Sequence, residues 1–165
     1  ADARRELVDA FGYAGVHLEG RRNAVLVQET LPLVDEYRVF VVDGAPVTGA
    51  GCIEAHTPCD RAADAPIPGF DPRVEGRRGS GDVRADAELA RDYARAADQV
   101  ASDFAREIPG MRDCVLDFAH AGDRDPLLVE VNPLPSAGLF ASDPDRLFRA
   151  IAERAEERAP STAEA

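Results

Sequence analysis

The sequence predicts an α+β fold in which an antiparallel sheet packs against helices. Three observations lead to this prediction: an alternating strand that ends in a tight turn, a second pair of strands near the C-terminus, and a long amphipathic helix between them. Packing helices on such a sheet buries the apolar sides of both. With 165 residues, of which 45% are hydrophobic and 30% charged, the chain is long enough for one such domain.

The first two elements that we expect are a short helix and a buried strand. Residues 3–11 carry apolar side chains at helical spacing, which predicts an amphipathic helix. Residues 24–31, AVLVQETL, form a mostly apolar, β-branched run of the kind found in buried strands. Pro32 ends this strand, because proline cannot donate a ladder hydrogen bond.

A hairpin follows. In the run EYRVFVVDG at 36–44, Glu36 and Arg38 fall on one face of the strand, and the odd-numbered residues fall on the other. The Asp-Gly pair at its end is typical of a tight hairpin turn. The return strand is expected at 46–55, PVTGAGCIEA, where the glycines indicate bulges or a close approach of other groups to the backbone.

A long loop and a long helix come next. Residues 57–84 are rich in proline and glycine and have no period, which predicts an irregular loop whose Arg77 and Arg78 could meet an anion. From Asp86 to Glu107 apolar residues recur at helical spacing. The expected core stripe of this helix is Leu89, Tyr93, Ala96, Ala97, Val100, Phe104 and Ile108.

The last elements are two strands and a helix. CVLDFA at 114–119 and PLLVEVN at 126–132 read as strands joined by a polar turn. The final helix is expected to have Ser142 or Asp143 as its cap and Pro144 in its first turn.

Charge and composition exclude several classes of function. The formal net charge of −12 repels nucleic acid and anionic lipid, so we expect neither as a partner. All 19 basic residues are arginine, and the chain has no lysine. Because no apolar stretch reaches the length of a membrane span and the first residues lack a signal-peptide core, we expect a cytoplasmic protein.

The cysteines suggest no disulfide framework, because there are three of them and no secretory signal. Cys52, His56 and Cys59 have a spacing that permits three zinc ligands on one segment. No fourth ligand with zinc-type spacing follows, however, so reduced thiols and a loop histidine are the favoured interpretation.

Two acids come together if the last two strands pair as a hairpin with a six-residue loop. In that register Asp117 faces Glu130 and Phe118 faces Val129, and Asn132 shares the face of the two acids. Directly opposed like charges are destabilising, so a cation is expected between them, either an arginine or a metal. Two carboxylates and an amide oxygen form an all-oxygen site that suits Mg²⁺.

The simpler alternative is that both acids are solvated on the wet face of the sheet. Each would then lie near an arginine such as Arg38 or Arg112.

The pattern of an aspartate followed after 13 residues by Glu-x-Asn resembles the metal-binding end of the ATP-grasp enzymes. In that family a strand ends in a hinge whose backbone binds adenine, and an acid about seven residues later binds the ribose; VQETL is similar to this hinge, and Glu36 lies seven residues after Glu29. EYRVFVVDG resembles the acid-x-Arg strand of the same fold. The resemblance runs from about Val25 to Leu147.

The resemblance implies an ATP- and Mg²⁺-binding ligase. Such enzymes form an acyl phosphate from a carboxylate, which an amine or thiol then attacks. The residues implied are, for the nucleotide, Gln28, Glu29, Thr30, Leu31, Glu36 and Arg38; for Mg²⁺, Asp117, Glu130 and Asn132; and for the acceptor side, Ser136 and Gly138. Arg38 would reach the phosphates or the reaction centre, and Glu130 could touch both metal ions.

The sequence departs from the family at two points: it has no lysine for the phosphates, and Val115 stands where an arginine is common. We therefore expect residues 1–158 to be an ATP-grasp C-terminal subdomain that needs a missing N-terminal subdomain to catalyse, with a disordered tail at 159–165. A small molecule or peptide is the expected substrate. The alternatives are a non-catalytic nucleotide- or partner-binding module and an ATP-dependent phosphotransferase.

Overall fold

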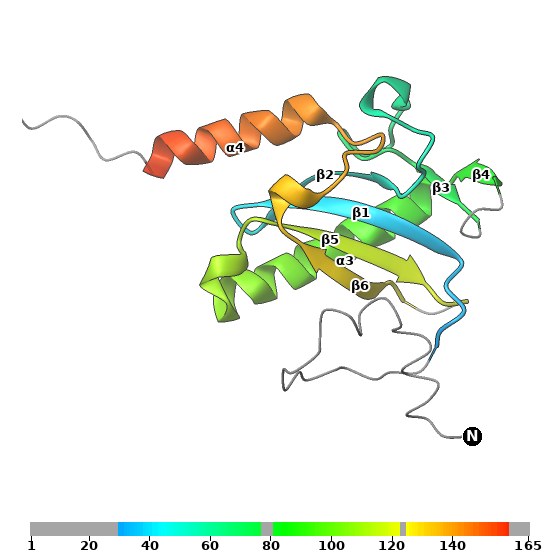
Figure 1. Cartoon of the computed structure of the whole chain (residues 1–165), viewed down its shortest axis with the longest axis horizontal. Coiled ribbons are helices and arrows are strands. Elements are labelled where there is room, and N and C mark those ends of the chain that lie inside the picture. The colour runs from blue at the N-terminus through cyan, green and yellow to red at the C-terminus, as the bar shows by residue number, and fades with distance from the viewer. Residues whose placement is uncertain (1–29, 77–80, 123–124, 159–165) are drawn as a thin grey trace, which may run out of the picture. The chain divides into compact units, whose positions relative to one another are not determined.

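The computed structural model describes residues 30–76, 81–122 and 125–158, and its centre is a four-stranded antiparallel sheet (Figure 1). The strand order is β2-β1-β5-β6, which confirms the α+β class. The strands are β1 (Asp35–Val42), β2 (Ala45–Gly51), β5 (Cys114–His120) and β6 (Leu127–Asn132). The helix expected at 3–11 and most of the strand expected at 24–31 lie outside the described residues.

The first hairpin forms as the sequence predicts. Asp43 and Gly44 have φ angles of 52° and 78°, the left-handed values that a tight hairpin turn requires. The return strand ends at Gly51, earlier than the expected 46–55. A Cβ on Gly51 would lie 2.4 Å from the carbonyl oxygen of Arg73, so the expected close approach of another chain segment is present.

Helix α3 (Ala87–Glu107) covers one face of the sheet. Its N-terminus is capped by Asp86, whose Oδ1 accepts a hydrogen bond of 3.0 Å from the backbone N–H of Leu89. Tyr93 of α3 stacks on Tyr37 of β1, with ring centroids 5.0 Å apart. The core stripe is largely as predicted, but Ile108 lies beyond the end of the helix and is 46% exposed, so its place in the core was wrong.

Helix α4 (Pro144–Arg158) packs on the opposite face. Pro144 begins the helix, as the sequence predicts. Leu147 packs with Phe40 and Val115 at one end of this face, where the even-numbered side chains of β1 are apolar. The helix therefore buries one end of the face, and the polar residues of β1 lie toward the other end.

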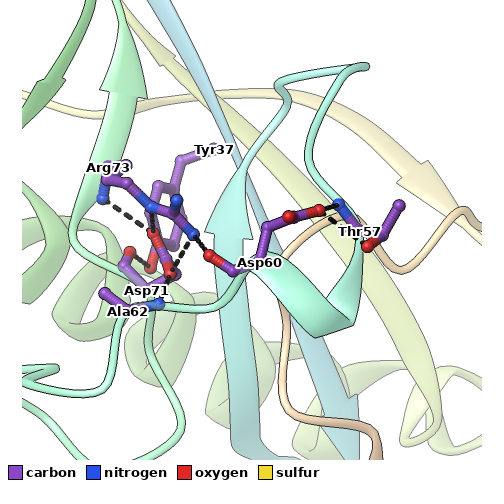
Figure 2. Close-up of polar contacts among 6 residues, drawn as sticks. All are labelled: Tyr37, Thr57, Asp60, Ala62, Asp71 and Arg73. Carbon is purple, nitrogen blue, oxygen red and sulfur yellow. Dashed lines mark hydrogen bonds and ion pairs between the residues drawn. The ribbon is translucent and has the colours of Figure 1, made fainter.

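The segment expected to be an irregular loop contains regular structure. Two short strands, β3 (Arg73–Glu75) and β4 (Val83–Ala85), pair as an antiparallel ribbon, and Pro58–Asp60 form a 3₁₀ turn. A network of polar contacts fastens this segment to the sheet (Figure 2). The interpretation of 57–84 as one irregular loop was thus wrong, because backbone pairing and side-chain contacts order it without an apolar period.

None of the described helices has both the length and the apolar character that crossing a membrane requires. The three cysteines carry free thiols.

Candidate nucleotide and metal site

The polar end of the sheet face opposite α3 carries the residues that the sequence singles out. Glu36 and Arg38 lie on this face because side chains two apart on a strand point the same way, whereas Tyr37 and Val39 are buried under α3. β1 is the central strand that pairs with both β2 and β5. Arg38 is therefore held with neighbours on both sides.

The opposition of the two acids is confirmed. Asp117 of β5 pairs with Glu130 of β6, and Leu116 pairs with Val131. One residue further on the register shifts, so that Phe118 pairs with Leu128 rather than with Val129. Val129 is 48% exposed, and its expected place in the core was wrong because the bulge turns it outward.

An arginine occupies the cationic position beside Asp117. Arg38 lies directly opposite Asp117 across the β1–β5 pairing. Its Nε donates to Oδ1 at 2.8 Å and its Nη2 to Oδ2 at 2.7 Å, the two-pronged arrangement that guanidinium and carboxylate groups favour. The hydrogen bond to Asp117 raises the pKa of Arg38, although partial burial acts in the opposite direction.

Further contacts hold this pair in place. Arg38 Nη1 donates to the carbonyl oxygen of Gly138 at 3.0 Å, and the guanidinium carbon lies 5.0 Å from the centre of the Phe140 ring. The Asn132 amide nitrogen donates to Asp117 Oδ2 at 3.3 Å. Glu130 is different: it is exposed, and within the described part of the chain its carboxylate has no hydrogen-bond partner.

Two adjoining cavities lie at this end of the face. The larger, about 570 Å³, is lined by Arg38, Asp117 and Glu130, and its volume is in the range of small-molecule sites. The smaller, about 310 Å³, is lined by Leu31, Pro32 and Leu33. The side chains of Glu36, Cys52 and Glu75 line both cavities, which are therefore neighbours.

The larger cavity is strongly acidic. Among the described residues that line it, five are carboxylates, Glu36, Glu54, Glu75, Asp117 and Glu130, and one is an arginine. Such a lining repels a free anion and attracts cations or a ligand that carries its own cation.

Comparison with known families decides the identity of this domain. The model of an ATP-grasp domain family, the second family of its clade, matches residues 8–150. The chain belongs to this family. No curated protein and no solved structure gave a significant match. Membership in the ATP-grasp domain family supports an ATP-dependent, ligase-like function in general terms.

Several residues suggested by the ATP-grasp resemblance are in or next to the cavities. Leu31, the last residue of the expected hinge, and Glu36 line the smaller one. Gln28 and Glu29 lie outside the described residues, and Thr30 lies outside any helix or strand.

The two residues expected on the acceptor side of the ATP-grasp cleft have different positions. Gly138 reaches the site through its carbonyl oxygen, which binds Arg38. Ser136 is exposed at the end of the 3₁₀ turn Leu134–Ser136, and it is not among the residues that line the larger cavity.

The sequence reasoning missed part of the wall of the larger cavity. Glu54, His56, Glu75 and Phe140 line it, although none was assigned to the nucleotide site. The sequence suggested His56 only as a zinc ligand. A signal for the other three is absent from local patterns, because loop packing and the β3–β4 ribbon bring them to β1.

The donor set fits Mg²⁺ in its chemistry. Asp117, Glu130 and Asn132 offer only oxygen ligands once the amide presents its oxygen, and oxygen is what Mg²⁺ prefers. In the described ranges, no group of three or more His, Cys, Asp and Glu side chains is placed to hold a metal, so the amide and a ligand oxygen would have to complete the site. Sharing Asp117 with a metal also requires its contact with Arg38 to loosen.

Proposed function

We propose that this ATP-grasp domain binds ATP with Mg²⁺ along the polar end of the sheet, with adenine in the smaller cavity and phosphates in the larger. The observation that carries the proposal is the position of Glu130: it faces Asp117 in register, has no hydrogen-bond partner within the described residues, and lines the cavity next to the one that contains Leu31. The acidic lining favours a nucleotide that arrives with its cation.

The reaction that we propose is carboxylate–amine or carboxylate–thiol ligation. A substrate carboxylate oxygen attacks the γ-phosphorus, the bond to the β–γ bridging oxygen breaks, and ADP leaves. The amine or thiol then attacks the acyl carbon of the acyl phosphate, inorganic phosphate leaves with the bonding electrons, and the nucleophile loses a proton. Bound Mg²⁺ supplies charge neutralisation on the phosphate oxygens.

The residues of this chain would position and stabilise the reacting groups. Two of the five N–H groups of Arg38 bind Asp117 and one binds Gly138, which leaves two for an oxygen that gains negative charge. Phe140 packs against the guanidinium and restricts its movement. Asp117, Glu130 and Asn132 would hold the metal, and Glu36 would accept hydrogen bonds from the ribose hydroxyls.

The proposal also includes partners. The lining contains one arginine among the described residues, too little positive charge for a triphosphate, so we expect an N-terminal ATP-grasp subdomain to supply more. The substrate would be a small molecule or a peptide. The net charge of −12 disfavours nucleic acid and anionic membranes, and the proposed location is the cytoplasm.

A specific observation favours a second candidate, a non-catalytic nucleotide-binding module. Both carboxylate oxygens of Asp117 accept hydrogen bonds from Arg38, so one of the proposed metal ligands is already neutralised by the protein. A module that only binds nucleotide could retain this ion pair permanently.

The test is an assay of ATP binding and turnover with the full-length protein. ATP binding is measured by calorimetry with and without Mg²⁺, and ADP release is followed over a panel of carboxylates paired with amines or thiols. Mg²⁺-dependent binding together with a ligated product in the mass spectrum supports the ligase. Binding without turnover supports the module, and a phosphorylated acceptor without a new bond between substrates supports a phosphotransferase. If ATP does not bind, all three are wrong.

A further inference from the structure

The wall of the larger cavity on the β2 side is the stretch that follows Gly51. The backbone N–H of Cys52 donates to the carbonyl oxygen of Glu36 at 3.0 Å, which continues the pairing with β1. The chain then turns, and the N–H of His56 donates to the carbonyl oxygen of Ile53 at 3.0 Å. This turn places His56 in the cavity wall.

The imidazole of His56 has an unusual environment. Its Nδ1 is buried and lacks a hydrogen-bond partner within the part of the chain that the structure describes. A buried polar atom without a partner costs stability and calls for an explanation. Because Nδ1 has no acceptor to receive a proton, a neutral ring carries its proton on Nε2, which can then donate to a ligand.

The cavity also lacks donors for an anionic ligand. Three of the five N–H groups of Arg38 are already used by Asp117 and Gly138. Apart from Arg38, His56 is the one described lining residue whose side chain can become cationic. Any anionic oxygen that enters on the β2 side of Arg38 therefore meets His56 first among these groups.

The segment that carries His56 is held firmly on its C-terminal side (Figure 2). Asp60 Oδ2 accepts hydrogen bonds from Thr57 N at 3.0 Å and Thr57 Oγ1 at 2.7 Å. The carbonyl oxygen of Asp60 accepts from Arg73, which is itself held by Asp71. These contacts keep the turn in one position before any ligand arrives, which is what a binding residue requires.

We infer that His56 is a ligand-binding residue that donates from Nε2 to an anionic oxygen in the larger cavity. The inference rests on the proposed function, and it adds a residue that the family motifs do not contain. The oxygen belongs either to the γ-phosphate of ATP or to the substrate carboxylate. Both present the same acceptor chemistry, so the experiment must separate them.

The experiment compares the wild-type full chain with His56→Leu, which removes the donor, and His56→Gln, which keeps one. Calorimetry measures binding of Mg-ADP and of the non-hydrolysable analogue Mg-AMP-PNP, and then binding of a carboxylate panel that starts with acetate and glutamate to the AMP-PNP complex. Removing a hydrogen bond to a charged group lowers affinity by about tenfold to a hundredfold.

A loss in His56→Leu for AMP-PNP but not for ADP assigns the contact to the γ-phosphate. Unchanged nucleotide affinity with a loss for a carboxylate assigns it to the substrate. In both cases His56→Gln should recover much of the affinity. Thr57→Ala is the matched control, because it removes the hydroxyl contact with Asp60 and leaves His56 in place.

Three results would overturn the inference: His56→Leu binds every probe as the wild type does, it loses ADP and AMP-PNP equally, or Thr57→Ala reproduces its losses. In each of these the wild type still binds nucleotide, so the proposed function stands. Failure of the wild type to bind either nucleotide is a different result, and it would overturn the proposed function itself. Circular dichroism and thermal unfolding establish that the variants are folded.

Discussion

Two arginine–aspartate pairs in this molecule have the same two-pronged geometry but different surroundings. Arg73 binds Asp71 with Nε–Oδ1 and Nη2–Oδ2 distances of 2.8 Å, and Arg38 binds Asp117 with distances of 2.8 and 2.7 Å. The Asp71 side chain is 1% exposed and that of Asp117 is 9% exposed. Only the second of these pairs lines the larger cavity.

The remaining contacts explain what each pair does. Asp71 also accepts hydrogen bonds from the backbone N–H groups of Ala62 and Arg73, and its carbonyl oxygen accepts from Tyr37 at 2.6 Å. Burial opposes its charge, but these contacts together lower the pKa of Asp71. Every one of these contacts is internal, so this pair fastens the chain, as Figure 2 shows.

The pair of Arg38 and Asp117 has a neighbour that the other pair lacks. Glu130 lies opposite Asp117 and is exposed in the same cavity. An ion pair by itself is therefore poor evidence of a binding site. A second like charge beside it, in a cavity and without a hydrogen-bond partner in the described part of the chain, is better evidence, because a ligand is needed to make it favourable.

The largest effect on stability is expected for Asp71→Ala. The change leaves Arg73 without its carboxylate and removes the acceptor for the N–H of Ala62. Breaking a buried pair in this way costs about 3–5 kcal/mol of the free energy of unfolding. Urea unfolding followed by circular dichroism measures this. Asp64→Ala is the matched control, because Asp64 is exposed in the same segment, and its change should stay within about 0.5 kcal/mol.

If Asp71→Ala instead leaves stability unchanged and abolishes nucleotide binding, the comparison between the two pairs is wrong, and the Asp71 pair belongs to the site.

A smaller loss of stability and a clear loss of binding are expected for Asp117→Asn. The neutral amide cannot accept two charged hydrogen bonds from Arg38, and we expect a cost of about 1.5–3 kcal/mol. Because Asp117 is also a proposed metal ligand, the affinity for Mg-ATP should fall at least about tenfold. Urea unfolding and calorimetry measure the two effects. Asp98→Asn, at an exposed position on α3, should change neither.

Full retention of Mg-ATP affinity in Asp117→Asn would mean that Asp117 serves the fold alone, like Asp71.

The local part of the site could be predicted from the sequence. Side chains alternate with a period of two on a strand, so the shared face of Glu36 and Arg38 and the opposition of Asp117 and Glu130 followed from spacing and loop length. The helix over 86–107 followed from its apolar stripe and its capping aspartate. In each case the information lies within one or two neighbouring elements.

The remainder depends on contacts between distant segments. The bulge that exposes Val129 shifts the register by one residue, and no local pattern marks it. The β3–β4 ribbon carries too few apolar residues to show a period, and its position depends on the Asp71 contacts. For the same reason His56 and Phe140, which come from two separate segments, could not be assigned to one cavity from the sequence.

The smallest effect on stability, and the sharpest test of the comparison, is expected for Glu130→Gln. The described part of the chain offers Glu130 no hydrogen-bond partner, and its charge faces Asp117, so removing the charge should change the free energy of unfolding by no more than about 0.5 kcal/mol. Mg-ATP affinity should nevertheless fall about tenfold to a hundredfold, because an amide oxygen is a weaker ligand for Mg²⁺ than a carboxylate. Glu153→Gln, on the exposed side of α4, should change neither. A folded Glu130→Gln variant that binds Mg-ATP as tightly as the wild type would contradict the metal role. A large loss of stability would instead make Glu130 a structural residue, and the distinction drawn between the two ion pairs would no longer hold.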